Sequence, residues 1–125
     1  MTGKKETKKT VLIGASTNPE RYAYLAVLNL LSKGYEVIPI GLKEGKIKDV
    51  EILTGLPFVE EVHTITLYIS PKHQPAYYNY VLNLQPQRVI FNPGTENKEF
   101  FDLLKAKKIE VIEACTLVML SIGNY

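Results

Sequence analysis

The sequence predicts a three-layer α/β/α protein built on a parallel sheet of about five strands, with helices on both faces. Two features support this fold class. Short apolar runs rich in β-branched residues alternate with segments of helical periodicity, and most of the runs stop close to a glycine or a proline. Parallel neighbours need right-handed crossovers, which the intervening helices supply. The expected fold is therefore Rossmann-like.

The first half of the chain predicts a strand, a helix and a second strand. Residues 10–14 (TVLIG) form a short apolar run, typical of a strand buried on both faces. Apolar residues recur every three or four positions over 20–33, which predicts an amphipathic helix, and Gly34 supplies its stop. Residues 35–40 predict the next strand, with Pro39 near its end.

The second half repeats this alternation. Between residues 42 and 62 only a short strand near 50–53 is expected. The remaining predicted elements are a strand at 63–69, a helix at 74–84, a strand at 88–91, a turn at 92–97, a helix at 98–107 and a strand at 109–113, followed by an apolar tail at 114–122.

The composition, with 46% hydrophobic and 22% charged residues, is that of an ordinary globular domain, and 125 residues is the length of one domain. Four of the fifteen lysines and arginines lie within residues 1–9, which are expected to form a flexible lysine-rich leader ahead of a domain at 10–125. The rest of the chain holds eleven basic and twelve acidic residues. A broad basic face for nucleic acid is therefore not expected.

Cysteine usage and hydropathy bear on the compartment. The single cysteine excludes an intrachain disulfide, so nothing indicates an oxidising compartment. No run of about 18 apolar residues is present, and the lysine-rich start lacks a small-residue cleavage site. A cytoplasmic protein that neither inserts into nor binds a membrane is the expectation.

Function should lie in the loops after the strands. Open parallel sheets bind ligands outside the carboxyl ends of their strands, where the strand order reverses. The candidate segments are residues 14–21, 41–46, 70–74 and 92–97 and the stretch around Cys115.

The loop after the first strand (GASTNPER) is the most informative of these segments. Gly14 permits a tight turn and close approach by a ligand. Ser16, Thr17 and Asn18 can either cap the helix or hydrogen-bond to phosphate oxygens, and both alternatives stay open. Arg21 favours the second, because a cation in the first helical turn opposes the helix dipole unless an anion is bound there.

This loop does not match the dinucleotide fingerprint or a Walker phosphate loop. Ser16 and Pro19 stand where G-x-G-x-x-G needs its second and third glycines, and no Gly-Lys-Ser/Thr follows. The second predicted strand also lacks an acidic residue at its carboxyl end, where Ile40, Gly41 and Leu42 stand. NAD recognition is therefore a poor fit.

Three segments resemble a known family. VLIGASTNPERY at 11–22, LSKGYEVIPI at 31–40 and NPGTEN at 92–97 are similar to the small stand-alone CoA-binding proteins, which are related to the CoA-binding domain of the succinyl-CoA synthetase alpha subunit. The resemblance extends from residue 10 to about residue 120. It implies a Rossmann-like nucleotide-binding domain with coenzyme A as its ligand.

The resemblance also implies a set of ligand-binding residues. Gly14, Ser16 and Arg21 would line the CoA diphosphate, and Lys43 would reach its phosphates, although Gly41-Leu42 precede this lysine where members commonly carry Asn-Pro. Ser70-Pro71 would lie beside the adenosine or the pantetheine. The full predicted set is Gly14, Ala15, Ser16, Thr17, Asn18, Arg21, Tyr22, Ile40, Lys43, Ser70, Pro71, Gln74, Asn92 and Gly94.

Catalytic residues are not indicated. Cys115 has no cation beside it in the sequence and reads as an inert cysteine, His63 begins a strand at the wrong end of the sheet, and His73 stands alone. No His/Cys/Asp cluster has metal-ligand spacing. The sequence thus predicts a protein that binds CoA or acyl-CoA without catalytic machinery. The alternative is a small NAD(P)- or acyl-CoA-dependent enzyme, or a subunit that depends on an unknown protein partner.

Overall fold

The computed structural model describes residues 7–125. In chain order the elements are β1 (Thr10–Ile13), α1 (Tyr22–Ser32), β2 (Val37–Ile40), β3 (Gly45–Ile47), β4 (Val50–Ile52), β5 (Thr64–Leu67), the 3₁₀ helix η1 (Pro71–Tyr77), α2 (Tyr78–Leu84), β6 (Arg88–Phe91), α3 (Lys98–Ala106), β7 (Glu110–Glu113) and α4 (Thr116–Ile122). No helix in this part of the chain is long and apolar enough to cross a membrane.

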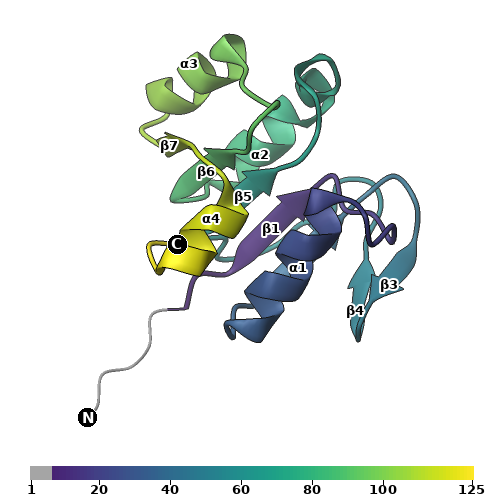
Figure 1. Ribbon diagram of the computed structural model, residues 1–125. Helices are drawn as coiled ribbons and strands as arrows, with labels where there is room; N and C mark the ends of the chain where they lie inside the picture. The colour runs from purple at the N-terminus through teal and green to yellow at the C-terminus, as the bar shows by residue number, and fades with distance from the viewer. Residues whose placement is uncertain (1–6) are drawn as a thin grey trace.

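The core of the molecule is a five-stranded parallel sheet in the order β2-β1-β5-β6-β7 (Figure 1). This confirms the predicted α/β Rossmann-like fold class. The chain starts at β1, moves outward to β2 and then returns to the other side of β1 at β5. The strand order therefore reverses between β1 and β5, which is where such sheets bind their ligands.

Both faces of the sheet are covered at its centre, which explains the apolar run of β1. In β1, Val11 and Ile13 pack into the core on the α2 and α3 side, whereas Leu12 packs into the core on the α1 and α4 side. All three side chains are fully buried. A strand buried on both faces reads as a continuous apolar run, and this is how the sequence predicted it.

The region between β2 and β5 holds more structure than predicted. Where only a strand near residues 50–53 was expected, β3 and β4 form an antiparallel hairpin, with Lys48 at positive φ in its turn. The hairpin is attached to the end of β2, because Gly41 N donates to Leu53 O and Leu53 N donates to Pro39 O. Its turn lacks glycine, the residue that most often signals a tight hairpin.

Two helix predictions need correction. The helix expected at 20–33 begins at Tyr22, and Arg21 is its N-cap residue. The helix expected at 74–84 is divided into η1 and α2, and η1 contains Pro75. Proline lacks the N–H that a regular α-helix needs, so this segment follows the tighter 3₁₀ path before α2 begins.

The apolar tail at 114–122 contains α4, which crosses one face of the sheet next to α1 (Figure 1). At its start, Thr116 N donates to Asn92 Oδ1 at 2.8 Å. Beyond its end, the Tyr125 hydroxyl bonds to Thr10 Oγ1, and the Arg88 guanidinium lies 4.4 Å from the Tyr125 ring centroid. The segment is therefore attached to the sheet both where the strands end, at Asn92, and where they begin, at Thr10.

The predicted leader at residues 1–9 lies mostly outside the described residues. Within the described part, Lys8 Nζ donates to Tyr125 O, and Lys9 O accepts from His63 N at 2.9 Å and from Thr64 N at 3.1 Å. These bonds attach Lys8 and Lys9 to the edge of the sheet where the strands begin.

Candidate functional site

Four segments follow the carboxyl ends of neighbouring strands and together form the edge that we call the ligand edge. They are the β1 loop (14–21), the β2 loop (41–44), the β5 loop (68–70, continuing into η1) and the β6 loop (92–97). The β1 and β5 loops stand on the two strands between which the order reverses.

Gly14 is required by the backbone of the neighbouring loop. Its φ is +106°, and a Cβ atom at this position would lie 2.7 Å from Tyr68 O and 3.0 Å from Ile69 Cγ2. Its N–H and that of Ala15 both donate to Ile40 O at 2.9 Å. The close approach expected of a ligand at Gly14 is thus made by the β5 loop, and the three loops at the point of reversal are in direct contact.

The β1 loop also packs against the hairpin. A Cβ atom on Gly45 would lie 2.5 Å from Thr17 Cγ2, so a larger residue here would require the threonine side chain to move. The β3–β4 hairpin therefore forms a side wall of the ligand edge next to the β1 loop.

Within the β1 loop, the polar side chains fold the loop rather than cap α1. Ser16 Oγ accepts from Asn18 N at 3.0 Å, and Asn18 Oδ1 accepts from Glu20 N at 3.0 Å. Arg21 N donates to Asn18 O, and no side chain caps α1 at Arg21. The alternative in which Ser16, Thr17 or Asn18 is a helix cap is therefore wrong.

The cations predicted for the ligand are at the surface of this edge. Arg21 and Lys43 are exposed, and neither side chain has a hydrogen bond or ion pair within residues 7–125. Tyr22, the first residue of α1, is 72% exposed. Ser70 and Pro71 are also exposed at the start of η1. These five side chains are accessible to a ligand at the edge.

Gly94 is exposed as well, at a φ of +93°. Its N–H donates to Glu96 Oε1 at 2.9 Å, so this backbone donor is already occupied inside the β6 loop.

Four of the predicted ligand residues have buried side chains, and one of them is Ala15, which packs into the core on the α1 and α4 side. Ile40 is fully buried in the core, and only its carbonyl faces the β1 loop. Asn92, 2% exposed, donates to Thr66 Oγ1 at 2.7 Å and to Leu67 O at 2.8 Å, besides accepting from Thr116 N. Gln74 is 0% exposed and hydrogen-bonded to two loops. These side chains organise the edge from below, a role that the sequence analysis did not assign to them.

Cys115 is half-buried and immediately precedes α4. The Tyr68 hydroxyl is buried close to Cys115 and Thr116. Burial, with a smaller contribution from Cys115, holds the pKa of Tyr68 well above its ordinary value. His63 Nδ1 lies 2.7 Å from Thr64 Oγ1, at the opposite end of β5 from the ligand edge.

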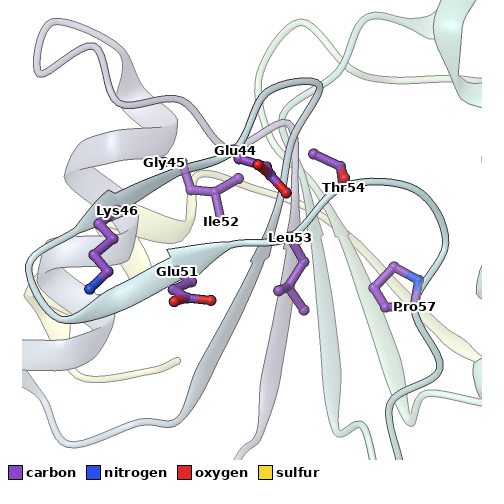
Figure 2. A pocket seen from close by; sticks show the side chains of 8 residues that line it. All are labelled: Glu44, Gly45, Lys46, Glu51, Ile52, Leu53, Thr54 and Pro57. Atoms are coloured by element: carbon purple, nitrogen blue, oxygen red, sulfur yellow. The ribbon is translucent and has the colours of Figure 1, made fainter.

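A cavity of about 560 Å³ lies beside the hairpin, outside the predicted set of residues. Figure 2 shows it between the hairpin and the segment that leads away from β4. Its lining consists of Glu44, Gly45, Lys46, Glu51, Ile52, Leu53, Thr54 and Pro57. The cavity lies next to the β1 loop, because Gly45, one of its lining residues, packs against Thr17. Sequence reasoning missed it because it had not found the hairpin.

Metal coordination finds no support in the described part of the chain, where no three or more His, Cys, Asp or Glu side chains are grouped closely enough to hold an ion. The edge instead offers hydroxyls, the N–H groups of Ser16 and Thr17, and the exposed cations Arg21 and Lys43, which is a donor set suited to a phosphorylated ligand.

The comparisons with solved structures find the same fold in other proteins. An uncharacterized protein is 49% identical, with a TM-score of 0.93, over 96% of this chain and 99% of that one. A hypothetical protein from Pyrococcus horikoshii OT3 is 27% identical (TM-score 0.80, 93% of this chain and 83% of that one). The cell-free ID.343 protein from Thermus thermophilus is 24% identical, with a TM-score of 0.81 over 94% of this chain and 91% of that one, which shows the fold alone.

The molecule is thus an α/β protein of Rossmann-like topology with a ligand edge at its point of strand reversal. Residues 8–121 match the family described as the CoA binding domain, so the chain belongs to that family. This confirms the resemblance drawn from the sequence. A search of the curated proteins finds no match.

Proposed function

We propose that this protein binds coenzyme A or an acyl-CoA, with the diphosphate of the ligand at the β1 loop. Membership of the CoA binding domain family is the observation that carries the proposal. The position of the β1 loop supports the choice of site, since it stands at the strand reversal and is bordered by the β2 loop, the β5 loop and the hairpin.

Charge and accessibility suggest roles for individual residues. Arg21 and Lys43 are exposed cations on two adjacent loops, and we assign them to the ligand phosphates. Ser16, Thr17 and Asn18 supply hydroxyl and amide groups between them, together with the N–H groups of Ser16 and Thr17, which the hydrogen bonds of the loop leave available. The exposed side chains of Tyr22, Ser70 and Pro71 and the backbone at Gly94 would border the rest of the ligand.

The proposal is one of binding, with no chemical step carried out by this chain. It also places the protein in the cytoplasm, where CoA is used in a reduced form and a single unpaired cysteine is stable.

Calorimetric titration and thermal unfolding with CoA test this function. A ligand present at 100 times its Kd stabilises the native state by about 2.7 kcal/mol, so millimolar CoA should raise the Tm clearly if Kd is micromolar. Arg21→Ala and Lys43→Ala should each weaken CoA binding about tenfold, whereas Lys107→Ala, which removes an exposed lysine beyond the end of α3, should not. No Tm change with CoA or acyl-CoA would refute the proposal, and unchanged affinity in both edge variants would move the phosphate site elsewhere.

A further inference from the structure

Gln74 is the only fully buried glutamine or asparagine side chain in the described structure, and it lies directly beneath the ligand edge. Its neighbours Lys72, His73 and Pro75 in η1 are exposed, so Gln74 alone points inward from this part of the helix. A buried amide is favourable only where its polar atoms are satisfied. Its partners therefore define what the side chain does.

Gln74 connects two loops that follow different strands. Its Nε2 donates to Ile69 O at 3.0 Å, within the β5 loop, and to Thr95 O at 2.7 Å, within the β6 loop. Its Oε1 accepts from Asn97 Nδ2 at 2.9 Å, also in the β6 loop. Both amide hydrogens and the carbonyl are thus used between these two loops.

Asn97 extends the connection to two helices. Its Nδ2 also donates to the Tyr78 hydroxyl at 2.9 Å, and that hydroxyl donates to Glu99 Oε1 at 3.0 Å. Its Oδ1 accepts from Phe100 N at 3.2 Å, which caps α3. We call Gln74 and Asn97 the loop clamp, since they join the β5 loop and η1 to the β6 loop and the start of α3.

We propose that Gln74 is a positioning residue for the ligand: through the loop clamp it makes the β5 and β6 loops a single rigid wall of the ligand edge. The inference rests on the proposed CoA-binding function. Gln74 has no exposed surface and all its polar groups are bonded to protein, so it acts through the exposed segments that it holds, Ser70-Pro71 and Gly94, rather than by contact.

The wall lies to one side of the proposed phosphate site. The sheet order places the β2 loop on one side of the β1 loop and the β5 and β6 loops on the other. CoA has its diphosphate between two long halves, the 3′-phosphoadenosine and the pantetheine. If the diphosphate lies at the β1 loop, the two halves leave it in different directions, and the wall borders only one of them.

Loss of the clamp should lower the fraction of molecules whose loops fit the ligand. Gln74→Leu keeps a side chain of similar size but leaves Ile69 O, Thr95 O and the Asn97 amide without these partners. Buried groups left in this way cost free energy, and the two loops can regain partners in water only by separating. The apparent affinity falls in proportion to the competent fraction, so we expect CoA binding about tenfold weaker.

The experiment compares binding of CoA, 3′,5′-ADP and 4′-phosphopantetheine to wild type and three variants. Gln74→Leu removes the clamp. Asn97→Ala removes its other half together with the α3 cap. Leu84→Ala is the matched control, since it removes apolar contacts from buried α2 without touching the clamp. Calorimetric titration with CoA and competition with the two half-ligands give the affinities, and urea unfolding gives the stability of each variant.

We expect CoA affinity to fall about tenfold in Gln74→Leu and Asn97→Ala, with the loss reproduced by one half-ligand and absent for the other, while Leu84→Ala loses stability and keeps its affinities. Unchanged CoA affinity in Gln74→Leu would make this residue purely structural and overturn the inference. An equal loss for both half-ligands would overturn it too, since the effect would not be confined to one wall. Failure of wild type to bind CoA would instead refute the proposed function.

Discussion

At the scale of single residues, Gly14 carries the strictest requirement of the ligand edge. A side chain there would meet the Tyr68 carbonyl, and its φ of +106° is one that L-residues rarely adopt. We predict that Gly14→Ala destabilises the fold by about 2 kcal/mol or more, because strain and overlap with backbone add together. Urea unfolding measures this. Gly55→Ala is the comparison: its φ is also positive, but nothing lies within 4 Å, so strain alone should give a smaller loss.

A variant at Ser16 can show whether the β1 loop hydroxyl serves folding, ligand binding or both. Its hydroxyl accepts one local bond, from Asn18 N, in an exposed loop. Ser16→Ala should therefore cost the apo protein less than about 1 kcal/mol, since water replaces that acceptor. If the hydroxyl also donates to a ligand phosphate, CoA affinity should fall about fivefold or more. Unfolding curves with and without saturating CoA measure both effects, and an equal loss in the two states would remove Ser16 from the phosphate site.

The same scale shows where sequence reasoning about the site was incomplete. Arg21 and Lys43, predicted to contact phosphate, are exposed, whereas the close approach predicted for a ligand at Gly14 is made by the β5 loop. The resemblance to the CoA-binding family implies that Asn92 and Gln74 contact the ligand, whereas in the structure both side chains are buried. Apart from Ile69, which is five positions from Gln74, their partners lie 21 to 26 positions away along the chain, and no local sequence pattern indicates that such amides are already hydrogen-bonded.

At the scale of elements, strands were predicted well because burial on both faces leaves an unbroken apolar run. The hairpin was missed for a related reason. Lys46 and Glu51 lie opposite each other across the hairpin and are exposed, so the segment mixes charged and apolar residues. The strand β3, which the sequence did not predict, is only three residues long. α1 begins two residues later than the apolar periodicity predicted, because the Ser16 and Asn18 side chains hold the residues before Arg21 in the β1 loop.

The attachment of α4 gives a prediction at this scale. Asn92 joins β5, β6 and the first turn of α4 through three side-chain hydrogen bonds at 2.7 to 2.8 Å. Asn92→Ala leaves Leu67 O on β5 and Thr116 N on α4 without this partner, and Thr66 Oγ1 keeps only its contact with Thr116 Oγ1, so we expect a loss of about 2–4 kcal/mol in the free energy of unfolding. Urea unfolding should show near-wild-type stability for Asn83→Ala, since Asn83 is exposed on α2. A loss below 1 kcal/mol for Asn92→Ala would mean that α4 is held by its apolar contacts alone.

For the whole molecule, buried tyrosines set the behaviour in alkaline solution. Burial raises the pKa of Tyr80 to about 12, and it also raises the pKa values of Tyr68 and Tyr125 above 10. These phenols lie in different parts of the molecule. Tyr80 donates to Pro57 O in the segment between β4 and β5, whereas Tyr125 bonds to Thr10 where β1 begins. Ionisation of any of them in the native state would place a charge in the core.

The sign of the pH effect follows from which state keeps its protons. Above pH 10 an unfolded chain loses its tyrosine protons while the native protein retains those of Tyr80, Tyr68 and Tyr125, so stability is complete below pH 10 and falls as pH rises toward 12. Each such tyrosine lowers the free energy of unfolding by up to about 1.4 kcal/mol per pH unit in this range. Tyr80→Phe should therefore be less stable than wild type at pH 8 by about 1 kcal/mol, through loss of the bond to Pro57, yet show a shallower decline between pH 10 and 12. Urea unfolding across this range measures the slope, and Tyr22→Phe, at a 72% exposed position, should leave it unchanged. A slope in Tyr80→Phe as steep as in wild type would show that Tyr80 ionises in the native state as readily as in the unfolded chain.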